Sequence, residues 1–153
     1  MNKKGFTLVE LLAVILLVTV IAGLAVPNVM SSINNSKRNT FLLDAKRMIA
    51  KAEYFVSSNR NDRTQIQSGG KVYTFSDLNE KAEFLKDADG GSYEAETFVY
   101  VFYSNSKFQY CACILGSKKR ITGSSNTCSY GNTIPGSGCV LSDNINGVEI
   151  VKD

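Results

Sequence analysis

Histidine, the side chain most often used for proton transfer near neutral pH, is missing from this chain of 153 residues. Its absence removes Ser-His and Cys-His catalysis and every histidine-ligated metal site. No glycine-rich phosphate loop, paired-carboxylate arrangement or metal-ligand spacing stands out in the rest of the sequence. The sequence therefore predicts no catalytic residue, no cofactor and no enzyme activity.

The four cysteines are the remaining reactive side chains, and all of them lie in the last 43 residues. An even number of cysteines in a short chain suits an oxidising compartment. Cys111 and Cys113 are two residues apart, so on a strand both point to the same face, and a disulfide between them would be strained. We therefore expect each of them to pair with one of the later two, Cys128 and Cys139, and the spacing does not decide which.

A four-thiolate zinc site is the alternative for these cysteines. Structural zinc sites usually separate the ligands of each pair by two to four residues. Here the gaps hold one and ten residues, so the spacing predicts disulfides and no metal. A redox Cys-x-x-Cys motif is absent from the sequence as well.

Charge gives little support for a nucleic-acid partner. The formal net charge is +3, and one dense basic run, Lys118-Lys119-Arg120, lies outside the N-terminus. Such a run could contact DNA phosphates, but three adjacent charges are more typical of a solvated turn. We do not expect nucleic acid to be the main partner.

Glu10 is the one charged residue in an apolar run from Phe6 to Met30. A helix of that length spans roughly 37 Å, enough to cross a hydrocarbon core of about 30 Å. An acidic residue inside it costs on the order of 3 kcal/mol on membrane-insertion scales. A buried carboxylate therefore needs a partner.

Two basic residues, Lys3 and Lys4, precede the apolar run, and no basic cluster follows until Lys37 and Arg38. The positive-inside rule keeps the N-terminus in the cytoplasm and sends the rest of the chain outward. A plain alternative is a secretory signal with a cleavage site at Val20-Ile21-Ala22, or a simple membrane anchor. Either would leave a monomeric secreted or membrane-anchored domain.

The stretch KKGFTLVELL, residues 3–12, resembles the processing site of the type IV pilin family, which includes the competence and type II secretion pseudopilins. The resemblance implies that a prepilin peptidase cleaves between Gly5 and Phe6 and methylates the new amine of Phe6. It also implies that Glu10 pairs with that amine on a neighbouring subunit during assembly.

Pro27 also fits the resemblance, because the family commonly has a proline at this position. A proline cannot donate a hydrogen bond to the carbonyl of Gly23, so we expect a kink or local melting from Gly23 to Pro27. The chain departs from the family at Thr19, where a glycine is frequent.

The resemblance implies a division into a cytoplasmic leader (1–5), a transmembrane and assembly helix (6–30) and an extracellular globular domain (31–153). It implies a single-pass membrane protein that becomes a cell-surface filament subunit with adhesive or motility functions. The implied partners are other subunits, the prepilin peptidase, the pilus assembly ATPase and platform protein, and membrane lipid before assembly. A competence or type II secretion pseudopilin is the alternative within the family.

The elements behind the membrane segment follow from periodicity. Apolar residues at spacings of four and three, from Phe41 to Phe55, predict that the helix continues to about Ser58 with one buried face. Residues 59–70 read as a polar loop and 71–75 as a strand. A second helix is expected after a Ser76 cap, with Leu85 facing inward, ending near residues 89–91.

A β-hairpin is predicted from two runs rich in aromatic and β-branched residues, 97–103 and 108–115. Weaker strands are expected at 119–122, 140–141 and 148–151. An antiparallel sheet packed on the amphipathic half of the helix would bury the apolar faces of both. The expected fold class is α+β and pilin-like: a long N-terminal helix packed on a C-terminal antiparallel sheet. A Cys128–Cys139 disulfide would resemble the C-terminal loop of many pilins, but it leaves Cys111 and Cys113 without good partners.

Overall fold

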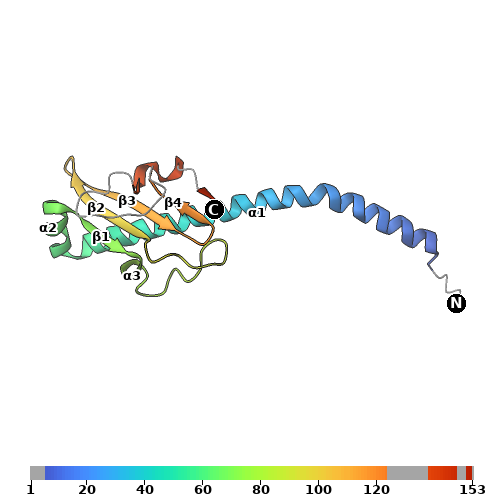
Figure 1. Cartoon of the computed structure of the whole chain (residues 1–153), viewed down its shortest axis with the longest axis horizontal. Helices are drawn as coiled ribbons and strands as arrows, with labels where there is room; N and C mark the ends of the chain where they lie inside the picture. The colour runs from blue at the N-terminus through green and yellow to red at the C-terminus, as the bar shows by residue number, and fades with distance from the viewer. Residues whose placement is uncertain (1–5, 124–137, 148–150, 153) are drawn as a thin grey trace. The chain divides into compact units, whose positions relative to one another are not determined.

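The computed structural model describes residues 6–123, 138–147 and 151–152. A long helix, α1 (Leu8–Ser58), opens the chain, and an antiparallel sheet follows it (Figure 1). The fold is therefore the expected α+β, pilin-like arrangement. Contacts divide the chain into two units, residues 1–36 and 37–153, and the first holds only the N-terminal part of α1.

The sheet has six strands among the described residues, in the order β1-β2-β3-β4-β6, with β5 paired to β3. Their bounds are β1 (Lys71–Thr74), β2 (Phe98–Ser104), β3 (Lys107–Leu115), β4 (Lys119–Ile121), β5 (Val140–Leu141) and β6 (Val151–Lys152). The hairpin β2–β3 is its centre, with Phe98 opposite Cys113 and Ser104 opposite Lys107. Asn105 and Ser106 form its two-residue turn, and both have positive φ, as such hairpin turns require. The hairpin prediction is confirmed.

The core of the second unit lies between α1 and one face of this sheet. Phe41, Ala45, Met48 and Ala52 on α1 have no exposed surface. They belong to one apolar cluster with alternate residues of the central strands, including Val99, Val101, Ala112 and Ile114. The spacing of four and three on the helix and of two on the strands is what brings these residues to one interface.

Two helices between α1 and β2 correct the sequence-based expectations. Residues 59–70 were expected to form a loop, but α2 (Arg60–Gly69) occupies them, with Asn59 as its N-cap. The helix expected after Ser76 is a single turn, α3 (Phe75–Leu78), and Thr74 caps it through a reciprocal pair of bonds with Asp77. Leu85 was expected to face inward and is 72% exposed.

The C-terminal part returns to the sheet through β5 and a 3₁₀ helix, η1 (Ser142–Gly147). A disulfide joins Cys111 of β3 to Cys139, the residue directly before β5. Since Cys111 lies opposite Leu141 in the strand register, the covalent bond and the strand pairing fix the same stretch of chain to β3.

Candidate functional site

The start of α1 carries the residues that the sequence singled out for processing and assembly. Phe6 lies before the helix with 79% of its surface exposed, and Gly5 lies outside the described residues. Glu10 is the third helical residue, and its Oε2 accepts hydrogen bonds from the amide of Thr7 (2.9 Å) and from Thr7 Oγ1 (2.8 Å). The Glu10 amide donates to Thr7 Oγ1 at 3.3 Å.

These three bonds form a capping box, in which the N-cap side chain and the third helical residue satisfy each other's backbone amides. The arrangement gives Glu10 two hydrogen-bond donors within its own chain. Sequence reasoning identified Glu10 but missed Thr7, although Thr-x-x-Glu before an apolar run is a recognised helix-start pattern.

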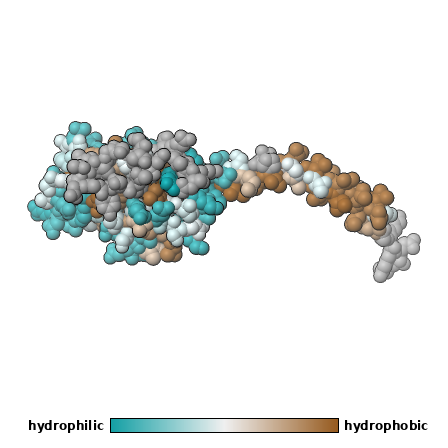
Figure 2. Space-filling view, in the orientation of Figure 1, coloured by the Kyte–Doolittle hydropathy of each residue, from teal (hydrophilic) through white to brown (hydrophobic). Residues whose placement is uncertain are grey.

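The helix that follows exposes an apolar surface along the first unit, as Figure 2 shows in brown. Leu8 is 81% exposed, Leu17 63% and Leu24 72%. The hydroxyl of Thr19 donates to the carbonyl of Leu16 (2.8 Å), so it adds no unpaired polar group to this surface. Among the described residues, α1 is the one helix whose length and apolar composition would allow it to cross a membrane.

The helix continues without a break past Gly23 and Pro27. Of the kink or local melting expected there, the melting is absent from the described backbone. A proline removes one backbone hydrogen bond, and the neighbouring turns remain helical on both sides. The side chain of Pro27 lies outside the described residues, and its part in assembly stays a prediction.

The cysteines belong to the second unit. Cys111 and Cys139 are bonded to each other, which excludes a Cys128–Cys139 disulfide. Cys113 is also disulfide-bonded, and it lies on the face of the sheet that carries Phe98 and Tyr100. Cys128 lies outside the described residues.

The basic run Lys118-Lys119-Arg120 is not the free patch that DNA binding would need. The Lys119 side chain is only 7% exposed, and its ammonium is bonded to the carboxylate of Asp89. Asp89 also pairs with Lys37 of α1 at 3.2 Å. The middle cation of the run therefore serves to hold the segment around Asp89 against the sheet and the helix.

A long apolar helix with a capped acidic start, leading into an α+β domain, is the arrangement of a pilin-like structural protein. Residues 1–26 match the family described as "Prokaryotic N-terminal methylation motif". The chain thus carries the signature of type IV pilins and pseudopilins, as the resemblance predicted. The signature points to a structural protein and implies prepilin-peptidase processing and filament assembly. No curated protein and no solved structure matches the chain.

Proposed function

We propose that the chain is a structural subunit of a type IV pilus-like filament. In this proposal it is inserted in the membrane through residues 6–30, cleaved between Gly5 and Phe6, and methylated on the new amine of Phe6. The observation that carries the proposal is Glu10. It is the one charged residue between Phe6 and Ser36, and it lies within the residues matched by the methylation motif.

In the membrane-inserted subunit, the two donors of Thr7 satisfy part of the hydrogen-bonding capacity of Glu10. Cleavage after Gly5 would create a cationic amine on Phe6. In the filament, Glu10 would pair with that amine on a neighbouring subunit, so that both charges are neutralised in an apolar environment. The pairing would also fix the axial register between subunits.

The partners in this proposal are further copies of the chain or related subunits, the prepilin peptidase, the assembly ATPase and its platform protein, and lipid before assembly. The globular unit would face outward on the cell surface, where disulfides persist. Adhesion, motility or surface attachment would follow from the filament as a whole.

A competence or type II secretion pseudopilin is the second candidate, because pseudopilins share the N-terminal motif. A DNA-uptake role predicts salt-dependent binding of the full chain to DNA. The burial of Lys119 in its ion pair with Asp89 weakens the case for the basic run as the contact. Absence of binding at low salt would eliminate this role.

The intact mass of the protein from its native cells tests the proposal. We expect a chain that begins at Phe6 and carries one additional methyl group. A chain that begins after Ala22 would identify an ordinary secreted domain and overturn the proposal. A chain that still begins at Met1 would contradict processing and indicate a plain anchor.

The role of the charge is tested with two variants. Glu10→Gln retains the capping box, since glutamine serves in the same position, but it removes the charge. Glu10→Ala removes the charge and the side-chain half of the capping box. We expect surface filaments to be lost in both variants, and filaments of ordinary abundance in Glu10→Gln would show that the charge is not required.

A further inference from the structure

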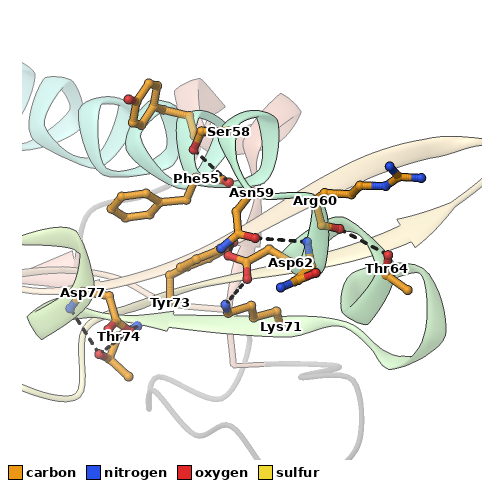
Figure 3. Close-up of polar contacts among 12 residues, drawn as sticks. Phe55, Ser58, Asn59, Arg60, Asp62, Thr64, Lys71, Tyr73, Thr74 and Asp77 are labelled. Carbon is orange, nitrogen blue, oxygen red and sulfur yellow. Dashed lines mark hydrogen bonds and ion pairs between the residues drawn. The ribbon is translucent and has the colours of Figure 1, made fainter.

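An open cleft of about 410 Å³ lies in the second unit, where the end of α1 meets α2, β1 and α3. Figure 3 shows five of its lining residues, Phe55, Asp62, Lys71, Tyr73 and Asp77. The lining of the cleft comes from four elements and the turn after α3. The lining residues used below are Phe55, Asp62, Lys71, Tyr73, Asp77 and Glu80. We call this feature the acidic cleft, because its lining holds three carboxylates and one ammonium group.

One wall of the acidic cleft is fixed by a buried carboxylate. Asp62 is 8% exposed and accepts hydrogen bonds from Lys71 Nζ and from the hydroxyl of Tyr73, both at 2.7 Å. The rings of Tyr73 and Phe55 lie 5.5 Å apart. Burial and the bond to Asp62 raise the pKa of Tyr73, so that its hydroxyl remains a donor. This wall is therefore aromatic and rigid.

The other two carboxylates lie in exposed residues, Asp77 and Glu80. Asp77 accepts bonds from the amide and hydroxyl of Thr74, at 2.9 and 2.8 Å. Glu80 has no hydrogen-bond or ion-pair partner in the part of the chain that the structure describes. The partly exposed ring of Phe55 beside an excess of carboxylates suits a guanidinium, which stacks on rings and binds carboxylates in bidentate fashion.

The same chain offers such a group on the solvent side of α1. Between residues 37 and 58 the helix has five basic residues and two acidic ones. Arg47 is 66% exposed, and its ion pair with Asp44 is long, at 3.5 Å. An exposed pair of this kind contributes little, so Arg47 is available to a partner.

Arg47 precedes Phe55 by eight residues on one helix, which corresponds to about 12 Å along the axis. Two parallel copies displaced by roughly that distance would place Arg47 of one copy level with the acidic cleft of the other. Such a contact joins two different surfaces, so it is heterologous and repeats along a filament.

We propose that the acidic cleft is the receptor for Arg47 of an adjacent copy of this chain in the assembled filament. The proposal rests on the filament function above and names one of its subunit contacts. In it, the guanidinium lies against the half-buried ring of Phe55 and pairs with Glu80 and Asp77. Tyr73 is 4% exposed and has Lys71 Nζ 5.0 Å from its ring centre, so it supports Phe55 from behind and does not itself contact the guanidinium. This contact lies in the globular units, apart from the helix segment 6–30.

Disulfide trapping tests the contact directly. The full-length chain carrying Arg47→Cys and Glu80→Cys is expressed in the native cells, and sheared filaments are analysed without reductant. We expect a ladder of covalent multimers that reductant collapses, because each copy donates one cysteine to each neighbour. The matched control combines Arg47→Cys with Glu96→Cys, since Glu96 is exposed and lies outside the cleft. A ladder of equal yield in the control, or none in the test pair, would overturn the contact.

Charge exchange gives an independent test. Arg47→Glu and Glu80→Arg should each lower the yield of filament severalfold, and the double variant should restore it to within about twofold. Lys46→Glu and Glu96→Arg are controls with the same charge changes at exposed positions, and they should leave the yield unchanged. All four sites are exposed, so the fold should tolerate the substitutions.

The outcomes separate this contact from the filament function itself. If the unsubstituted chain forms no filament, both proposals fail. If filaments form but neither trapping nor charge exchange behaves as expected, the contact is wrong and the filament function stands. If the acidic cleft binds some other cationic ligand, filaments will form but the trapping and charge-exchange results will not be as expected.

Discussion

Thr7 supplies hydrogen-bond donors to the Glu10 carboxylate from within the same chain. Its hydroxyl both donates to the Glu10 carboxylate and accepts from the Glu10 amide. In lipid, where water does not compete, a satisfied carboxylate is far less costly than a bare one. If α1 enters a membrane as proposed, the capping box lowers the cost of placing an acidic residue in its first turn.

Replacing Thr7 by valine keeps the side-chain volume and removes the hydroxyl. We expect the first helical turn to loosen, so that amide hydrogen exchange at Glu10 and Leu11, whose amides bond to Thr7, accelerates by roughly fivefold, as a loss of about 1 kcal/mol with the N-cap implies. Nuclear magnetic resonance of the full chain in detergent micelles measures it. Thr7→Ser, which keeps a hydroxyl, is the control, and equal exchange in the valine and serine variants would contradict the role of the cap.

Asp87 and Asp89 are carboxylates of the second unit whose pKa lies below its ordinary value in the folded chain. The hydrogen bond from Lys119, aided by Lys37, lowers the pKa of Asp89. Burial alone would raise the pKa of Asp87, but hydrogen bonds from Ser117 and from the amides of Asp89 and Gly91 outweigh it, and the net direction is downward. Both carboxylates hold the segment 87–91 to the turn between β3 and β4.

A carboxyl whose pKa is lower in the folded state stabilises the fold fully above its unfolded pKa, near 3.9, and loses that contribution as pH falls through the folded value. We therefore expect the free energy of unfolding to stay level from about pH 8 to pH 5 and to fall below about pH 4. Urea titrations of the full chain in mild detergent measure this. Asp89→Asn should be less stable at pH 7 and should respond less to acid, and an unchanged acid response would contradict the assignment.

At the scale of elements, the corner between α2 and β1 depends on Gly70. Its φ of +83° and ψ of 168° lie in a region that is essentially restricted to glycine. A Cβ there would lie 2.2 Å from the hydroxyl oxygen of Tyr100, whose side chain is itself buried. Both the backbone conformation and the nearby Tyr100 side chain therefore disfavour any residue other than glycine at position 70.

Gly70→Ala should destabilise the second unit by on the order of 1–3 kcal/mol from backbone strain alone, and by more if Tyr100 must move. Thermal unfolding of the full chain in detergent measures the change. Gly69→Ala is the neighbouring control, since a Cβ at Gly69 meets nothing within 4 Å. A similar loss in both variants would contradict the special role of Gly70.

Elements whose apolar residues recur at a regular helix or strand spacing were predictable from the sequence. Elements that depend on tertiary contacts were not. The stripe from Phe41 to Phe55 and the hairpin β2–β3 follow from spacing alone. In contrast, α2 is almost entirely polar, and it buries only Asp62 and Ile66. Its stability comes from contacts with β1 and β2, which no local pattern reveals.

The same reasoning explains which parts of the site were predictable. Glu10 is conspicuous because it interrupts an apolar run, so the segment that matches the methylation motif could be identified from one short stretch of sequence. The acidic cleft assembles residues from Phe55 to Glu80 through a helix that was expected to be a loop. Its existence depends on the path of α2, and the sequence alone could not indicate it.

At the scale of the whole molecule, most of the exposed apolar surface in the described part of the chain lies in the first unit. Of the 22 exposed large apolar side chains in the described part of the chain, 17 lie between Phe6 and Ile33. The five that remain, including Leu43 and Tyr54, are scattered over the second unit. Scattered single residues are normal on a soluble surface, whereas a continuous apolar stretch requires lipid or other helices.

This division predicts how fragments of the chain behave. A fragment of residues 31–153 keeps the helix face that packs on the sheet and omits most of the exposed apolar stretch. We expect it to be monomeric in buffer without detergent and to unfold in one cooperative transition, measured by ultracentrifugation and urea titration. A fragment of residues 53–153 lacks Phe41, Met48 and Ala52, all fully buried, so it should aggregate or remain unfolded. If the longer fragment also needs detergent, apolar surface outside the first unit must hold the subunits together. If the 31–153 fragment is soluble without detergent, the contacts proposed with lipid and with the filament core belong to the N-terminal part of α1 that this fragment lacks.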